Sequence, residues 1–228
     1  MEISAEVKKM SLFSALSGKE LGEIVRCIVI RSFRKKVTIF SEGEHSGCFF
    51  VLSSGKVKIT KMSLEGKEMI IELISPGDFF GVFAVLKEFP YPASATAMTD
   101  SRVLCISRKD LLRIIERFPN IMFQITAQLS ERVREFPDML KNIALERVES
   151  RIASLLLKLA EKTGSKIASG EIELDLRLTR QDISEMVGAT VETAIRVMSR
   201  FRKAGIIRYN GGIIVVRDKK ALTDIVGS

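Results

Sequence analysis

One acidic and one basic side chain, Glu192 and Arg196, lie four residues apart in the segment GATVETAIRVMSRFRKA, residues 188–204. On a helix this spacing puts both on one face, where they can pair with each other or face a partner together. An exposed ion pair of this kind contributes only tenths of a kcal/mol. Alternatively, the guanidinium matches the O6 and N7 acceptors of guanine, and the carboxylate can accept from the amino group of cytosine. The elements around the two residues must decide between these interpretations.

The charge of the chain favours an acidic partner. The net charge is +8, and residues 190–220 hold eight Lys or Arg side chains against two acidic ones. This surplus of six in one short segment accounts for most of the excess positive charge. Such a concentration is the electrostatic footprint expected of a surface that meets a polyanion.

Catalytic and metal-binding side chains are sparse. His45 is the one histidine, and Cys27, Cys48 and Cys105 are dispersed without CxxC spacing. We therefore expect reduced thiols in or near the core, and neither an enzyme nor a zinc or iron–sulfur site. The N-terminus lacks the apolar run of a signal peptide, and no apolar run is long enough to span a membrane. A cytoplasmic protein without a membrane partner is expected.

The first half of the chain changes its hydrophobic period twice. Residues 11–27 have the apolar spacing of a helix, and residues 27–107 consist of short β-rich runs separated by Gly, Pro, Asp and Ser. This succession of short strands predicts a sandwich or barrel. The stretch LEGKE predicts a hairpin in which Gly66 supplies a positive φ. A short capped helix is predicted to begin after Ser107.

A long helix is predicted from residue 119. Apolar side chains recur along it at steps of three and four residues, and include Ile125, Leu129, Phe136, Leu140 and Ile143. This stripe fits a coiled-coil seam and equally fits packing against the helix's own domain. Pro137 lies inside the predicted helix, so the helix should either break near residue 136 or bend there.

The last part of the chain reads as a helix over about 144–162, a Gly/Ser-rich loop over 162–172, and a short strand. A second helix should follow Thr179 as its N-cap and end at Gly188, and a third should run from Thr190 to Gly205. Asn210-Gly211-Gly212 then predicts a β-hairpin. Helix, short turn, helix and hairpin is the order of a winged helix-turn-helix, whose second helix enters the major groove. Glu192 and Arg196 would lie in its first two turns.

Four motifs carry a resemblance that covers nearly the whole chain: GKVKI, SPGDFFG, ASATA and LTRQDISEMVGATVETAIRVMSRFRKAGII. The sequence resembles the regulators related to the cyclic-AMP receptor protein and the fumarate–nitrate reductase regulator, the CRP/FNR family. The resemblance implies an α+β fold with a β jelly-roll sensor domain at 1–118, a dimerisation helix at 119–145 and a winged helix-turn-helix domain at 146–228. It implies a homodimeric, sequence-specific transcription regulator gated by a small-molecule or redox/gas signal. The alternative is a sensing module that binds no DNA, which the basic C-terminal block disfavours.

The resemblance also assigns DNA-contacting positions. Glu192 and Arg196 match the family's base-reading pair, and Val191 stands where the cyclic-AMP branch has a further Arg. The oxygen-sensing branch shares Val-Glu-Thr here but has Ser where this chain has Ile195. Palindromic TTGA-like half-sites in double-stranded DNA are therefore expected, with RNA polymerase as a further partner. The implied contact residues are Thr179, Arg180, Gln181, Thr190, Val191, Glu192, Thr193, Ile195, Arg196, Arg200, Arg202 and Lys203.

The sensor positions depart from the family. Val82 stands where cyclic-nucleotide binders have the Glu that holds the ribose, and Ala93 where they have the Arg that pairs the phosphate. Cyclic AMP is therefore not expected. Residues 1–26 contain no Cys, so the family's iron–sulfur cluster is not expected either.

An apolar pocket remains, and the short motif FPYPASA resembles the haem-linked branch. A haem stays open, although His45 is interpreted as a surface residue, and a thiol sensor at Cys48 or Cys105 stays open as well. Phe79, Phe80 and Phe83 are interpreted first as jelly-roll core. The pocket candidates are Phe80, Gly81, Val82, Phe83, Ala93, Ser94 and Gln128.

Overall fold

The computed structural model describes residues 6–8, 10–167 and 170–227, apart from the side chains at 138 and 139. The chain divides into two compact units, residues 1–134 and 135–228, which are described separately. The predicted three-part division at residues 118 and 145 stays a prediction, because the long helix contributes residues to both units.

The first unit begins with a short 3-10 helix, η1 (Ser11–Phe13), and α2 (Gly18–Val25). The single helix predicted over 11–27 is thus divided. Ser17 and Glu20 form a capping box, in which each side chain bonds the other residue's backbone N–H, and this starts a new helix at Gly18.

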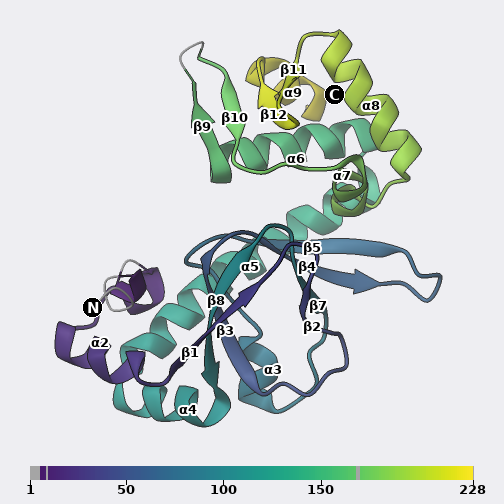
Figure 1. Ribbon diagram of the computed structural model, residues 1–228. Helices are drawn as coiled ribbons and strands as arrows, with labels where there is room; N and C mark the ends of the chain where they lie inside the picture. The colour runs from purple at the N-terminus through teal and green to yellow at the C-terminus, as the bar shows by residue number, and fades with distance from the viewer. Residues whose placement is uncertain (1–5, 9, 168–169, 228) are drawn as a thin grey trace. The chain divides into compact units, whose positions relative to one another are not determined.

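Two four-stranded antiparallel sheets form the body of this unit (Figure 1). One has the order β1-β8-β3-β6 and the other β2-β7-β4-β5. The strands are β1 (Ile28–Phe33), β2 (Thr38–Phe40), β3 (Cys48–Ser54), β4 (Val57–Met62), β5 (Glu68–Ile74), β6 (Phe79–Phe80), β7 (Ser94–Ala97) and β8 (Ser101–Ser107). The predicted turn at Gly66 has φ +77° and joins β4 to β5. The β-rich sensor fold is therefore confirmed.

Two helices complete the unit before the long one. The short helix α3 (Val82–Lys87) follows β6, and α4 (Arg108–Arg117) follows β8. The predicted N-cap of α4 is confirmed, because the Ser107 hydroxyl accepts from the backbone N–H of Asp110 at 3.1 Å.

The long helix α5 (Pro119–Leu145) continues through Pro137, so it does not break near residue 136. Proline has no backbone N–H, and α5 loses the bond that residue 137 would donate to the Val133 carbonyl. The turns on either side maintain the helix.

The apolar stripe of α5 differs from the predicted one at its start. Ile125 is buried in the core of the first unit and cannot lie on an exposed seam, while Leu129 is partly buried against that core. The outward-facing side chains instead alternate at steps of four and three along the helix. They are Met122, Thr126, Val133, Phe136, Leu140 and Ile143, with Leu129 completing the register.

The second unit contains α6 (Val148–Thr163), α7 (Arg180–Val187), α8 (Val191–Lys203) and α9 (Lys219–Val226). One sheet of order β11-β12-β10-β9 accompanies them (Figure 1). Its strands are β9 (Gly164–Lys166), β10 (Ile172–Leu174), β11 (Ile207–Asn210) and β12 (Ile213–Val216). The hairpin predicted at Asn210-Gly211-Gly212 is confirmed.

Two elements of this unit were not predicted. The segment 162–172, predicted as a loop, contains β9, which pairs antiparallel with β10. The helix α9 begins after Asp218, whose carboxylate accepts from the Ala221 N–H at 2.9 Å. Among the described residues, no helix is long and apolar enough to cross a membrane.

Candidate nucleic-acid interface

Local capping sets the geometry of the two helices that carry the candidate site. Thr179 starts α7 through a capping box with Asp182, and Gly188 ends it with φ +62°, a conformation that favours glycine. Thr190 then caps α8 by accepting from the Thr193 N–H at 3.3 Å. The turn between the helices is therefore short and specified by the residues themselves, as predicted.

The helix α8 has one buried and one exposed face. Its buried side chains are Ala194, Val197, Met198 and Phe201. Its outer face presents Glu192, Ile195, Arg196, Arg202 and Lys203 to solvent. Five of the twelve residues that the sequence assigned to the DNA contact thus lie on one accessible surface of a single helix.

Glu192 and Arg196 do not pair. Within the described part of the chain, neither side chain takes part in a hydrogen bond or an ion pair, although the two lie four residues apart on α8. The interpretation of these residues as a routine surface ion pair is therefore wrong. Both groups keep their full hydrogen-bonding capacity for an external partner.

The basic residues near the C-terminus fall into two classes. Arg200 pairs with Glu149 at 2.6 Å, Arg208 and Arg217 both contact Glu171, and Lys219 contacts Glu161 at 3.0 Å. No described carboxylate lies within ion-pair distance of the remaining four, which are Arg196, Arg202, Lys203 and Lys220. Four of the eight basic side chains in residues 190–220 are therefore engaged in ion pairs within the unit, with three carboxylates.

Arg180, at the start of α7, lies over the ring of Tyr209 in the wing hairpin, with 4.5 Å between the guanidinium carbon and the ring centroid. Burial raises the pKa of Tyr209, and the positive charge of Arg180 offsets part of that rise. This cation–π contact joins the first helix of the motif to the wing. Tyr209 was absent from the predicted site, and only its place beside the Asn-Gly-Gly turn could have indicated it. Gln181, next to Arg180, donates to Glu185 at 2.6 Å.

The candidate effector residues of the first unit do not form one open polar pocket. Val82 is 2% and Ala93 8% exposed, and Phe80 is buried as well. Phe83, interpreted as core, is instead 54% exposed, because it lies on the outer side of the short helix α3. The Gln128 side-chain amide donates a hydrogen bond to the Ser11 hydroxyl at 2.9 Å, and the Ser94 hydroxyl accepts one from the backbone N–H of Glu42 at 2.9 Å.

Aromatic rings fill the interior beside these positions. Phe40 stacks on Tyr91 with centroids 3.8 Å apart, and Phe50 stacks on Phe80 at 5.2 Å. The Tyr91 hydroxyl donates to the Cys48 carbonyl at 2.6 Å, and burial raises its pKa to about 12. Val82 and Ala93, the positions that the resemblance relates to a ribose hydroxyl and a phosphate, thus carry apolar, buried side chains.

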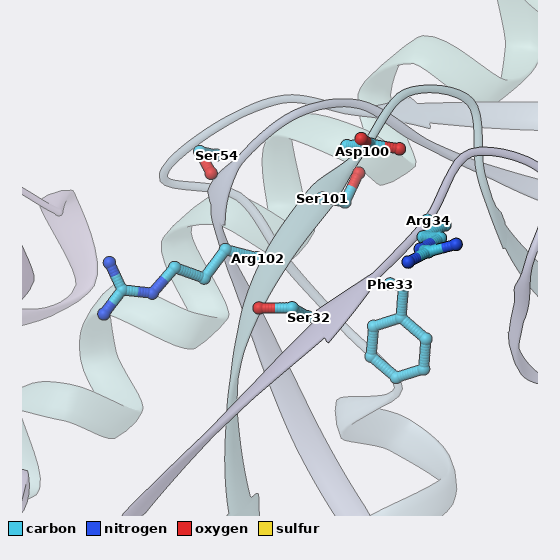
Figure 2. Close-up of a pocket in the computed structure, with 7 residues that line it drawn as sticks. All are labelled: Ser32, Phe33, Arg34, Ser54, Asp100, Ser101 and Arg102. Carbon is cyan, nitrogen blue, oxygen red and sulfur yellow. The ribbon is translucent and has the colours of Figure 1, made fainter.

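A cavity of the first unit lies away from these residues (Figure 2). It measures about 360 Å³ and opens at the ends of β1, β3 and β8, with none of the predicted effector residues in its wall. Its polar groups carry both signs of charge, and two of them are engaged by neighbours: Asp100 accepts from the Lys35 N–H at 2.8 Å, and Arg102 contacts Glu6 at 3.4 Å. The lining residues are Ser32, Phe33, Arg34, Ser54, Asp100, Ser101 and Arg102.

The candidate thiol and haem ligands differ in their exposure to solvent. Cys105 is buried, and burial raises the pKa of its thiol to about 12, so it stays protonated and unreactive at neutral pH. Cys48 is half-buried, and His45 is exposed on the loop between β2 and β3. The described residues contain no group of three or more His, Cys, Asp or Glu side chains placed to hold a metal ion.

Comparison with known proteins identifies both parts of the chain. Residues 30–118 match the cyclic nucleotide-binding domain, and residues 150–225 match the Crp-like helix-turn-helix domain. The cAMP-activated global transcriptional regulator CRP of Pasteurella multocida is 30% identical over 188 residues, which is 82% of this chain and 89% of that protein. The CRP-like cAMP-activated global transcriptional regulator of Mycobacterium tuberculosis is 28% identical over 214 residues, covering 94% of this chain and 95% of that protein.

A solved structure, that of FixK2 from Bradyrhizobium japonicum, has the same fold. Its TM-score is 0.76 at 24% sequence identity, over 87% of this chain and 96% of that one. A β-rich domain that matches the cyclic nucleotide-binding domain, a long helix and a helix-turn-helix with free acidic and basic side chains thus occur together in one sequence. The chain belongs to the CRP/FNR family of DNA-binding transcription regulators.

Proposed function

We propose that this protein is a homodimeric, sequence-specific transcription regulator of the cytoplasm that reads palindromic TTGA-like half-sites with α8 and acts on RNA polymerase. The observation that carries the proposal is the exposed face of α8, where Glu192 and Arg196 have no partner among the described residues. Arg196 is suited to the guanine and Glu192 to the cytosine of a G·C pair or of neighbouring pairs.

The unpaired cations of α8 also support the proposal that its exposed face contacts DNA. Arg202 and Lys203 follow on α8 itself, and both are exposed. Side chains of this type contact phosphates, which hold a protein in register on the duplex without reading its sequence. Arg200 is less suited to this task, because Glu149 already neutralises it.

Dimerisation is proposed from the outer stripe of α5. Its side chains repeat at alternating steps of four and three residues, the spacing of a coiled-coil seam. Leu140 is 67% exposed and Phe136 48%, and a second copy of the chain would remove this apolar surface from water. A two-fold dimer presents two α8 helices to the two halves of a palindrome.

The effector is proposed to be a small molecule or a redox or gas signal other than cyclic AMP. Each polar ligand group left unpaired in a buried site costs roughly 1–3 kcal/mol. Two such losses weaken binding by at least roughly 30-fold, at about 1.4 kcal/mol per decade. Calorimetry with cyclic AMP and cyclic GMP should therefore show no micromolar binding, and such binding would contradict this part of the proposal. An absorption spectrum of anaerobically purified protein would reveal a haem.

Selection from random-sequence DNA followed by gel-shift titration tests the central proposal. We expect enrichment of a palindrome with TTGA-like half-sites. Recovery of no preferred sequence, together with weak binding at physiological salt, would instead support a sensing module that does not act on DNA. Selection should be repeated with the Glu192→Ala variant, which should relax the preference at the G·C pair while retaining binding to unselected DNA.

A further inference from the structure

An apolar strip runs beside the charged pair on the outer face of α8. Ile195 is 48% exposed, and Val191, four residues earlier, is half-buried. Glu192 directly follows Val191, and Arg196 directly follows Ile195. The helix α8 therefore presents two parallel columns, one apolar and one charged. The sequence VETAIR encodes both columns at once.

Ile195 has no structural task within its own unit. The helix is held to the unit by the opposite face, where Ala194, Val197, Met198 and Phe201 are buried. A β-branched residue is also a weaker helix former than Arg, Lys, Gln or Glu, which are well suited to exposed helix positions. The isoleucine therefore costs the fold a little and contributes little to it, which points to an external contact.

The surroundings define that contact. Arg196, Arg202 and Lys203 lie on the same exposed side of α8 without ion pairs in the described part of the chain, so the surface complements a polyanion. In the major groove of DNA, the apolar group that a base presents is the C5-methyl of thymine. A branched aliphatic side chain next to a guanine-reading arginine is thus suited to a thymine next to that G·C pair.

We propose that Ile195, flanked by Val191, contacts the C5-methyl group of a thymine adjacent to the G·C pair read by Glu192 and Arg196. The inference rests on the proposed function and names the chemical group that specifies a neighbouring position of the half-site. Because 5-methylcytosine presents its methyl group at the same groove position, methylated cytosine at that base should be tolerated better than cytosine.

Replacing thymine by uracil tests the contact, since uracil lacks only this methyl group. One buried methyl corresponds to roughly a fourfold change in affinity. The wild-type dimer should bind about fourfold more weakly for each half-site that carries uracil at this base. With Ile195→Ala the thymine-to-uracil ratio should fall to about one, while Arg196→Ala should weaken both sites and keep the ratio.

The controls separate the possible failures. Uracil outside the half-sites should have no effect, and Ile195→Ala should fold normally because the side chain is exposed. Equal wild-type binding to thymine and uracil sites would overturn the inference, as would a ratio that survives in Ile195→Ala. Either result is compatible with sequence-specific binding, whereas failure to select any DNA sequence would overturn the proposed function itself.

Discussion

The outer face of α8 and the interior of the first unit differ in the side chains they present. On α8, Glu192 and Arg196 are charged, and both are exposed without a partner among the described residues. In the first unit, Val82 and Ala93, where the resemblance led us to look for ligand-binding polar groups, are apolar and buried. An unpaired charge is tolerated at a surface, where water solvates it, but is costly inside. The exposed polar groups of α8 are therefore available to an external partner, whereas the buried apolar side chains offer no polar contact.

The arginine pairs of the second unit extend the comparison. Arg196 is free, while Arg200, four residues along the same helix, contacts Glu149 of α6. Two side chains of one type on one helix thus have different tasks: one remains available, and the other fixes α8 to its neighbour. Sequence position alone does not distinguish them.

The largest expected effect is on DNA affinity, and it tests whether two copies of α8, one from each subunit, bind the two half-sites together. Leu140→Glu places a charge in the proposed α5 seam and should give monomers, measured by sedimentation or light scattering. Loss of the second half-site contact should weaken binding to the palindrome by about 10²–10⁴-fold. The matched control is Leu145→Glu, on the same helix but outside the seam register and also exposed. Dissociation by both variants, or by neither, would place the dimer interface elsewhere.

Arg196→Ala should remove the feature that distinguishes the α8 face from the apolar interior of the first unit, because it deletes the free guanidinium donor of that face. A bidentate contact to guanine contributes about 1–3 kcal/mol of discrimination, so the selected site should lose that much while random DNA loses little. Lys220→Ala, also exposed and without a described ion pair, serves as the control. Gel-shift titration on both DNAs measures the difference, and equal losses would assign Arg196 to phosphate.

Arg202→Ala and Arg200→Ala sharpen the comparison between free and paired cations. Removing one phosphate contact should make the slope of log K against log salt shallower by about 0.9. We expect this change for Arg202→Ala and little change for Arg200→Ala, whose charge Glu149 already compensates. Binding to a random duplex between low and moderate salt measures both slopes. A clear slope change for Arg200→Ala would show that the ion pair opens on DNA.

The effect expected for the buried interior is absent at neutral pH and appears only under alkaline conditions. Burial raises the pKa of the Cys105 thiol from its ordinary 9.0, and that of the Tyr91 hydroxyl from its ordinary 10.0, to about 12. Between these values the unfolded chain releases protons that the folded chain retains, so unfolding becomes more favourable as the pH rises. The stability from both groups should be complete below about pH 9 and lost toward pH 12.

Denaturant titrations of wild type and Cys105→Ala across this alkaline range check the expectation. Part of the alkaline loss should disappear in the variant, after allowance for the cavity that the smaller side chain leaves. The same alkaline loss in both proteins would show that Cys105 does not titrate as a buried group.

The sequence by itself determined those elements whose signals are local. Thr179, Gly188 and Thr190 act on backbone groups within three or four residues, so α7, the turn and α8 could be predicted with their caps. The Asn-Gly-Gly hairpin was predictable for the same reason. These local elements place Glu192 and Arg196 on one helix face, which is the basis of the candidate site.

Only the tertiary structure decided how distant segments use the remaining residues. Glu149 and Arg200 are 51 positions apart in the chain, and nothing local indicates their pairing. Ile125 and Leu129 both fit an apolar stripe, yet Ile125 packs into the core of the first unit. The exposed stripe therefore does not include Ile125, although it still includes Leu140. Hydrophobic spacing states that a face is apolar, but burial depends on what packs against it, and that is set by the whole fold.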